Sequence, residues 1–324
     1  MAARETRARW IGIAPLRGFG YSGVMNRALA LFAPALLAAA PASSPRADIV
    51  TSDADRFYAM YDATGGRPDA GRVQRDYLDK ATPGLAEFAQ MRGITADRIV
   101  ARIAENSKMF AEARQCVAVL PAVKRRLARA LGHLARIYPA AVFPPVTILV
   151  GRGKTGGTAN RRAVMIGLET LCSYDFLDLG REDRFVYIAA HEYVHVQQPA
   201  AQLEDPNDSV LKASLIEGAA EFIDELISGS VAYTHLHRLN RGREREVETA
   251  FVADMDKVAL KSDWLYNQKL PLERRDLGYW VGYRIAKAYY RNAPDKRAAV
   301  AEIIGMTDPK AFLARSGWTP GMTL

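Results

Sequence analysis

The chain has 324 residues, of which 49% are hydrophobic and 25% charged, and this globular composition excludes a disordered or collagen-like chain. Its length suffices for one large domain or for two closely packed lobes. The formal net charge of +8 invites nucleic-acid binding, but residues 1–42 alone hold five arginines and one glutamate. Across residues 238–248 the arginines are interleaved with glutamates, which is typical of a solvated helix face. We therefore expect no nucleic-acid partner.

The N-terminal segment, residues 1–42, has the pattern of an export signal. Arg27 precedes a short uncharged apolar run over residues 28–42, and residues 40–42 are small, as signal peptidases require. The run is shorter than the about 20 residues of a membrane span. Met25 stands directly before this pattern and is an alternative translation start. We expect a periplasmic or secreted protein with no stable membrane span after cleavage; a buried N-terminal helix is the alternative.

The chain has two cysteines, Cys116 and Cys172. In an oxidising compartment they can form one disulfide that closes a long loop. Two separate buried thiols are the alternative, and the sequence does not decide between them. Two cysteines are too few for a structural zinc site.

Residues 43–139 are predicted to form a helical N-terminal region, because apolar side chains recur at helical spacing. Two short β-branched or apolar runs, residues 146–150 and 163–166, then predict strands. One of them is expected to pair with an extended substrate. The glycine-rich loop 151–157 between them lacks the residue order of a phosphate-binding loop and is followed by a strand, which excludes that function.

The C-terminal part, residues 140–324, is predicted to be a second domain that is again mainly helical after its strands. Pro199 and Gly229 are expected to end its first two helices. The predicted helices cover residues 183–198, 209–228, 240–260, 277–291 and 295–304. A small sheet beside many helices is an α+β fold.

The strongest chemical signal is His191-Glu192-Tyr193-Val194-His195, an H-E-x-x-H motif. Residues four apart lie on the same face of a helix, so both imidazoles can bind one metal ion. Glu192 can then act as general base on a water that the metal activates. The motif predicts one zinc ion held by His191 and His195.

A catalytic zinc site needs a third protein ligand. The H-E-x-x-H-x-x-G-x-x-H arrangement is excluded, because Pro199 follows and the glycine is missing. Glu217 and Glu221 stand instead in an otherwise apolar stretch, where a carboxylate is unfavourable unless it is paired or bound to metal. The neighbouring Gly218 is expected to let the two helices approach closely.

These features resemble the gluzincin clan of zinc peptidases, in which H-E-x-x-H is followed by a ligand glutamate on a later helix. The resemblance is closest to an uncharacterised bacterial family of predicted zinc-dependent proteases. It rests on residues 191–195 with Gln197 and Gln198, on residues 214–222 and on residues 277–285. With weaker similarity it extends over most of the chain from about residue 55.

The resemblance implies a mostly helical, zincin-like fold with Glu217 as the third ligand. Glu221 would orient a zinc-bound histidine, although the clan usually has aspartate there. The exchanged assignment, with Glu221 as the ligand, stays open. Peptidases of this clan often use a tyrosine or histidine to stabilise the oxyanion, and Tyr279 and Tyr283 are the catalytic candidates here.

Arg284 is a further candidate for the oxyanion role beside the two tyrosines, and the tyrosines could equally be core or wall residues. His235 and His237 are expected to lie exposed in a loop, and His133, in an arginine-rich helix, is expected to be a bystander.

The predicted function is hydrolysis of peptide bonds in a peptide or protein substrate. Two alternatives remain, a zinc-fold binding or scaffold protein without turnover and a zinc hydrolase of a non-peptide amide or ester. The sequence does not determine the substrate, the cleavage specificity or the oligomeric state.

Overall fold

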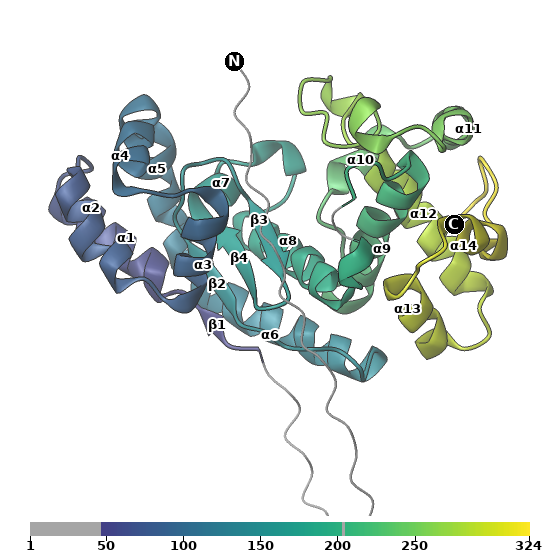
Figure 1. Ribbon diagram of the computed structural model, residues 1–324, viewed down its shortest axis with the longest axis horizontal. Coiled ribbons are helices and arrows are strands. Elements are labelled where there is room, and N and C mark those ends of the chain that lie inside the picture. The colour runs from purple at the N-terminus through teal and green to yellow at the C-terminus, as the bar shows by residue number, and fades with distance from the viewer. Residues whose placement is uncertain (1–46, 203–204) are drawn as a thin grey trace, which may run out of the picture. The chain divides into compact units, whose positions relative to one another are not determined.

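The structure, a computed structural model, describes residues 47–202 and 205–324 and contains one small mixed sheet among many helices (Figure 1). This arrangement confirms the predicted α+β class. The export signal predicted for residues 1–42 lies outside the described residues. Within the described part, no helix combines the length and the apolar character that crossing a membrane requires.

The sheet has four strands in the order β1-β2-β4-β3. β1 and β4 run parallel to β2 on its two sides, and β3 runs antiparallel to β4 at the edge. The strands are β1 (Ile49–Val50), β2 (Val146–Leu149), β3 (Gly157–Asn160) and β4 (Ala163–Gly167). β2 and β4 are buried along their whole length, which explains why both read as continuous apolar runs.

The sequence did not predict β1 or β3. β3 is Gly-Thr-Ala-Asn, without the alternation of apolar and polar residues that marks a strand. β2 and β4, for which substrate pairing was expected, are each paired on both sides by other strands, so that expectation was wrong. Of the strands next to the glycine-rich loop, β3 is the one at the sheet edge.

The N-terminal region is helical, as predicted. Some of its helices pack against the sheet, whereas its last helix packs against the helix that carries the two histidines. Its helices are α1 (Ser52–Ala63), α2 (Ala70–Asp76), α3 (Pro83–Arg92), α4 (Ala96–Glu105), α5 (Ser107–Ala113) and α6 (Leu120–Ile137). Thr82 caps α3 by accepting a hydrogen bond from the backbone N–H of Leu85, and Pro83 occupies the first helical position. α1 and α3 pack on β2, and β1 of this region pairs with β2. The domain boundary expected between residues 139 and 140 stays a prediction.

A disulfide joins Cys116, in the turn before α6, to Cys172, the last residue of α7 (Leu168–Cys172). The Cα atoms of the two cysteines lie 6.1 Å apart. This bond decides between the two alternatives that the sequence left open. It is consistent with an oxidising compartment.

The helix with the H-E-x-x-H motif, α8 (Arg181–Gln197), packs on β3 and β4, and Figure 1 shows the sheet between α3 and α8. α9 (Val210–Ser228) packs against α8. Ser209 caps α9 at its start, and Gly229, with φ 95°, ends it in the left-handed region. Both helices agree with the predicted boundaries to within two residues.

The remaining helices are α10 (Thr234–Leu239), α11 (Glu244–Asp254), α12 (Leu277–Asn292), α13 (Lys296–Ile304) and α14 (Pro309–Ser316). They pack against α9 or against its neighbour α12. The helix predicted over residues 240–260 corresponds to α11, which is shorter, because it begins only after Gly242, with φ 82°, and ends at Asp254. α12 lies along α9, with Gly218 facing Gly282. The close approach expected at Gly218 therefore exists, but toward α12 rather than toward the histidine helix.

Candidate metal centre

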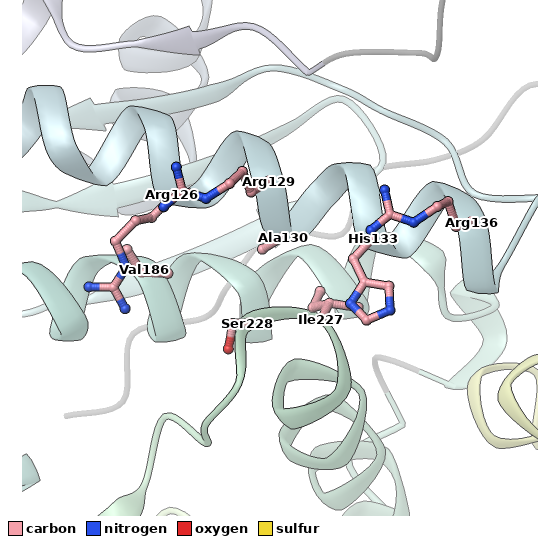
Figure 2. A pocket seen from close by; sticks show the side chains of 8 residues that line it. All are labelled: Arg126, Arg129, Ala130, His133, Arg136, Val186, Ile227 and Ser228. Atoms are coloured by element: carbon pink, nitrogen blue, oxygen red, sulfur yellow. The ribbon is translucent and has the colours of Figure 1, made fainter.

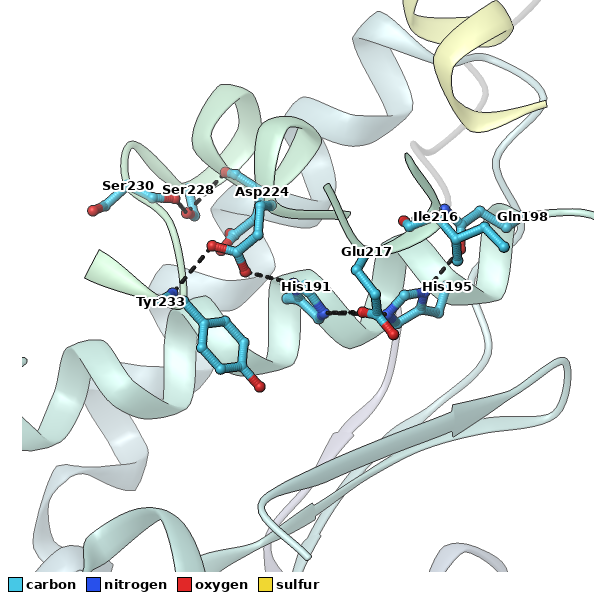
Figure 3. Close-up of polar contacts among 10 residues, drawn as sticks. His191, His195, Gln198, Ile216, Glu217, Asp224, Ser228, Ser230 and Tyr233 are labelled. Atoms are coloured by element: carbon cyan, nitrogen blue, oxygen red, sulfur yellow. Dashed lines mark hydrogen bonds and ion pairs between the residues drawn. The ribbon is translucent and has the colours of Figure 1, made fainter. Parts of the chain in front are cut away.

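Three side chains from α8 and α9 meet at one point (Figure 3). The Nε2 atoms of His191 and His195 lie 3.1 Å apart. Oε2 of Glu217 lies 3.4 Å from the first of these atoms and 3.2 Å from the second. His191 is 3% exposed and Glu217 8%, so the group is buried. Two of the side chains come from one face of α8, as the motif predicts, and the third comes from the crossing helix.

The three polar atoms are spaced as the ligand atoms of one tetrahedrally bound metal ion would be, and zinc serves as the comparison. Zinc bound tetrahedrally at about 2.0–2.1 Å keeps its ligand atoms about 3.3 Å apart. The three measured separations, 3.1, 3.2 and 3.4 Å, fit that value. Two imidazoles and one carboxylate are also a common donor set for catalytic zinc, with a fourth position left for water or substrate. Within the described residues, His191, His195 and Glu217 thus form a group that could hold one metal ion.

The first imidazole is oriented by Glu221, one turn after Glu217 on α9. Oε1 of Glu221 lies 2.7 Å from Nδ1 of His191, and Oε2 accepts a hydrogen bond of 3.1 Å from the backbone N–H of Tyr233. A proton on Nδ1 leaves the lone pair on Nε2 free to bind metal, and such carboxylate–histidine contacts recur at zinc sites. Of the two carboxylates, Glu217 faces both imidazoles, whereas Glu221 contacts the far side of one.

The second imidazole is oriented by a residue that the sequence did not single out for this role. Nδ1 of His195 lies 2.8 Å from Oε1 of Gln198. The amide of Gln198 is buried, and its Nε2 donates a hydrogen bond of 2.8 Å to the backbone oxygen of Ile216. Because the amide nitrogen is engaged there, the amide oxygen turns to His195, which fixes the proton on Nδ1 and leaves Nε2 free. A polar side chain three residues after the second histidine was the available signal.

Tyr266 also reaches the group and was missed. Its hydroxyl donates a hydrogen bond of 2.9 Å to Oε1 of Glu217, the oxygen that does not face the imidazoles. It lies in the irregular segment between α11 and α12, where the sequence shows no periodicity that would indicate its position.

Glu192 lies on α8 against the edge strand. A Cβ built on Gly157 of β3 would lie 2.6 Å from both Cγ and Oε1 of Glu192, so only glycine at this point leaves room for the carboxylate. Burial raises the pKa of Glu192, and the imidazoles of His195 and His191 oppose that shift. A raised pKa suits a carboxylate that takes up a proton during a reaction.

The charges of the group are tightly coupled. Burial alone would lower the pKa of His191, but contacts with Glu217 and Glu221 outweigh it and hold that pKa well above its ordinary value. Burial alone would raise the pKa of Glu217, but His195 and His191 outweigh it and lower that pKa. Carboxylates that attract protons to the imidazoles equally attract a divalent cation, whose binding requires the imidazoles to be neutral.

The tyrosine candidates lie at different distances from the group. The ring of Tyr279 stacks on that of His191, with centroids 6.1 Å apart, and it also contacts Tyr233. The hydroxyl of Tyr283 instead bonds to Glu225 on α9 at 2.9 Å. The third candidate, Arg284, pairs with Glu248 in the core between α11 and α12. Of these candidates, Tyr279 is the one whose ring contacts a member of the triad.

The remaining histidines lie elsewhere. His237 lies half-buried on α10, not exposed in a loop as expected. His235, on the same helix, is 1% exposed, so the expectation was wrong for it as well. Burial, with the nearby charges of Arg275 and Arg238, lowers its pKa to about 4. His133 lines a cavity of about 260 Å³ between α6, α8 and α9, and no member of the triad lines it (Figure 2). His133 thus lies apart from the triad, as expected.

Comparison of the chain with protein-family models, with curated proteins and with solved structures finds no match.

Proposed function

We propose that the chain is a zinc-dependent peptidase in which His191, His195 and Glu217 hold the metal and Glu192 is the general base. The observation that carries this proposal is the triangle of ligand atoms, which has the size of a tetrahedral zinc site. Glu192 stands next to the first ligand in sequence and points from α8 toward β3.

Bound zinc supplies Lewis-acid chemistry, because it polarises a carbonyl oxygen and lowers the pKa of water toward about 7. Glu192 takes the proton of the water that attacks the carbonyl carbon and passes it to the leaving amine nitrogen, so that one water is consumed for each bond cleaved. Glu221 and Gln198 hold the imidazoles in the tautomer that leaves both Nε2 atoms free.

The substrate would bind along β3. This strand is at the edge of the described sheet, and Gly157 in it contacts Glu192. A peptide that adds to the edge as a further strand makes backbone hydrogen bonds and passes the general base. An extended peptide is therefore a better fit to this edge than a compact small molecule.

We also propose that the protein acts outside the cytoplasm, in the periplasm or after secretion. The disulfide between Cys116 and Cys172 supports this localisation, and so does the export pattern in residues 1–42.

The proposal is tested by Glu192→Gln, which keeps the size of the side chain but cannot accept a proton. We expect the variant to keep one bound zinc and to lose cleavage of a broad library of fluorogenic peptides by at least about 100-fold. The matched control is Glu182→Gln, the same change on the same helix, where Glu182 pairs with Arg126. The control should cleave like the unaltered protein.

Two outcomes would contradict the proposal. Cleavage by Glu192→Gln at the unaltered rate would remove Glu192 from the mechanism. If the zinc-loaded, unaltered protein cleaves no peptide in the library, a binding protein is favoured instead. If it cleaves esters or other amides but no peptide, a hydrolase of those compounds is favoured.

A further inference from the structure

The two oxygens of Glu217 have different surroundings. Oε2 faces the Nε2 atoms of His191 and His195, at 3.4 and 3.2 Å. Oε1 accepts the hydrogen bond from the hydroxyl of Tyr266, at 2.9 Å. One oxygen is thus directed to the metal position and the other is occupied by a donor.

The segment between α11 and α12 holds Tyr266 in an unusual backbone conformation. Its φ is 58°, in the left-handed region, which residues other than glycine and asparagine rarely adopt. Directly after it, Asn267 and Asp276 form a reciprocal pair: the backbone N–H of each donates to the side-chain oxygen of the other, at 3.3 and 3.0 Å. This pair closes the loop from 267 to 276 and fixes the start of α12. A strained conformation that a local contact maintains often marks a functional position.

The side chain of Tyr266 is not a core residue. It is 54% exposed, although its hydroxyl lies against the buried carboxylate of Glu217. Its ring contacts Tyr279 edge to face, with centroids 6.5 Å apart. The hydroxyl therefore accounts for the position of Tyr266 better than burial of the ring does.

We propose that Tyr266 is a positioning residue that makes Glu217 bind the metal through one oxygen only. This inference rests on the metal site of the proposed function. A carboxylate can bind a metal ion through one oxygen or through both. A hydrogen bond to Oε1 competes with the second mode, and contacts of this kind orient ligands at metal sites. With one oxygen from Glu217 and two nitrogens, the fourth position stays open for water or substrate.

The test uses Co²⁺, whose visible absorption bands are intense in four-coordinate sites and weaken when a fifth ligand is added. Tyr266→Phe removes only the hydroxyl, and we expect weaker bands in the Co²⁺ protein because Oε1 of Glu217 becomes free to bind. Asn267→Ala loosens the loop but keeps the hydroxyl, and we expect a smaller change in the same direction. Near-ultraviolet circular dichroism verifies that both variants are folded.

Tyr283→Phe is the matched control. It also removes a tyrosine hydroxyl that lies 2.9 Å from a carboxylate of α9, but that carboxylate is Glu225, which is not in the triad. The spectrum of the control should equal that of the unaltered protein. A Tyr266→Phe spectrum identical to that of the unaltered protein would overturn the inference, as would an equal change in the control.

The inference and the proposed function fail in different ways. If the unaltered zinc-loaded protein cleaves no peptide but Tyr266→Phe weakens the bands of the Co²⁺ protein, the peptidase proposal fails and the role of Tyr266 stands. If peptides are cleaved and the bands do not change, only the role of Tyr266 fails. If the unaltered protein binds no Co²⁺, both fail.

Discussion

Replacing Gly218 by alanine perturbs the contact between α9 and α12 next to Glu217, the proposed third ligand. A Cβ at this position would lie 2.0 Å from the carbonyl carbon of Gly282 and 2.1 Å from the backbone nitrogen of Tyr283. Ordinary van der Waals contacts are 3.4–4 Å long, so the helices must separate by more than about 1 Å. No change of rotamer relieves this contact, because the atoms on both sides are fixed to the backbone.

The expected effect is a loss of stability. Over-packing in a core costs about 1–3 kcal/mol, and the better helix propensity of alanine returns at most about 1 kcal/mol. We expect Gly218→Ala to lower the free energy of unfolding by about 2 kcal/mol, measured by urea denaturation. Because residue 217 precedes the site of the clash, we also expect weaker metal binding, measured by titration against a chelator.

The same substitution should have the opposite sign at Gly132, in the middle of α6. A Cβ there meets only the guanidinium of Arg136, at 4.0 Å. Helix propensity then dominates, and Gly132→Ala should raise the free energy of unfolding by up to about 1 kcal/mol. If Gly218→Ala is as stable as the unaltered protein, or if both variants are stabilised, the close contact of α9 with α12 is refuted.

Three further predictions concern the disulfide, a buried carboxyl group and the support of the second histidine. The disulfide closes a loop with a sequence separation of 56, so the double variant Cys116→Ala, Cys172→Ala should lose up to about 4 kcal/mol in the free energy of unfolding. Dithiothreitol should lower the melting temperature of the unaltered protein and leave that of the double variant unchanged. Burial raises the pKa of Glu169 from 4.5 in the unfolded chain to about 7 in the folded protein, so between these pH values only the folded state holds a proton on this carboxyl group. The free energy of unfolding should therefore fall by up to about 3 kcal/mol as the pH rises from 4.5 to 7. In Glu169→Gln this contribution to the pH dependence should vanish. Gln198→Met should weaken metal binding about 10–100-fold in a chelator titration, because it removes the contact with His195. Gln197→Met should leave metal binding unchanged, because the amide of Gln197 bonds to backbone atoms. Equal effects of the two substitutions would contradict the role of Gln198.

The sequence predicted the parts of the site that depend on helical periodicity. Residues four apart on one helix must share a face, so the spacing of His191 and His195 was informative without any tertiary structure. The apolar helix indicated that Glu217 and Glu221 both need partners, and only the family resemblance implied Glu217 as the third ligand. The structure places Glu217 beside the imidazoles.

The contacts that support the triad could not be predicted in the same way. Tyr266 comes from an irregular segment, and its position depends on how the pair of Asn267 and Asp276 closes a loop. β3 is too short and too polar to give a strand pattern, although Gly157 in it makes room for Glu192. These features follow from tertiary contacts, which the local periodicity of the sequence does not indicate.

In the fold, too, features set by local sequence could be predicted, whereas features set by tertiary contacts could not. The ends of α9 follow from Ser209 and Gly229, which the sequence displays as a cap and a stop. α12 has two glycines four residues apart, Gly278 and Gly282, on the face toward α9. That Gly218 packs there against Gly282, rather than against the histidine helix, depends on the crossing of three helices and is not encoded in any single segment.

The most direct test of the metal centre is the metal content and affinity of the purified protein beside His195→Ala and Glu217→Ala, with circular dichroism as the control for folding. We expect one zinc ion bound per chain in the unaltered protein and loss of tight binding in both variants. An unaltered protein that binds no zinc, or a folded Glu217→Ala that binds zinc as tightly as the unaltered chain, would contradict the account.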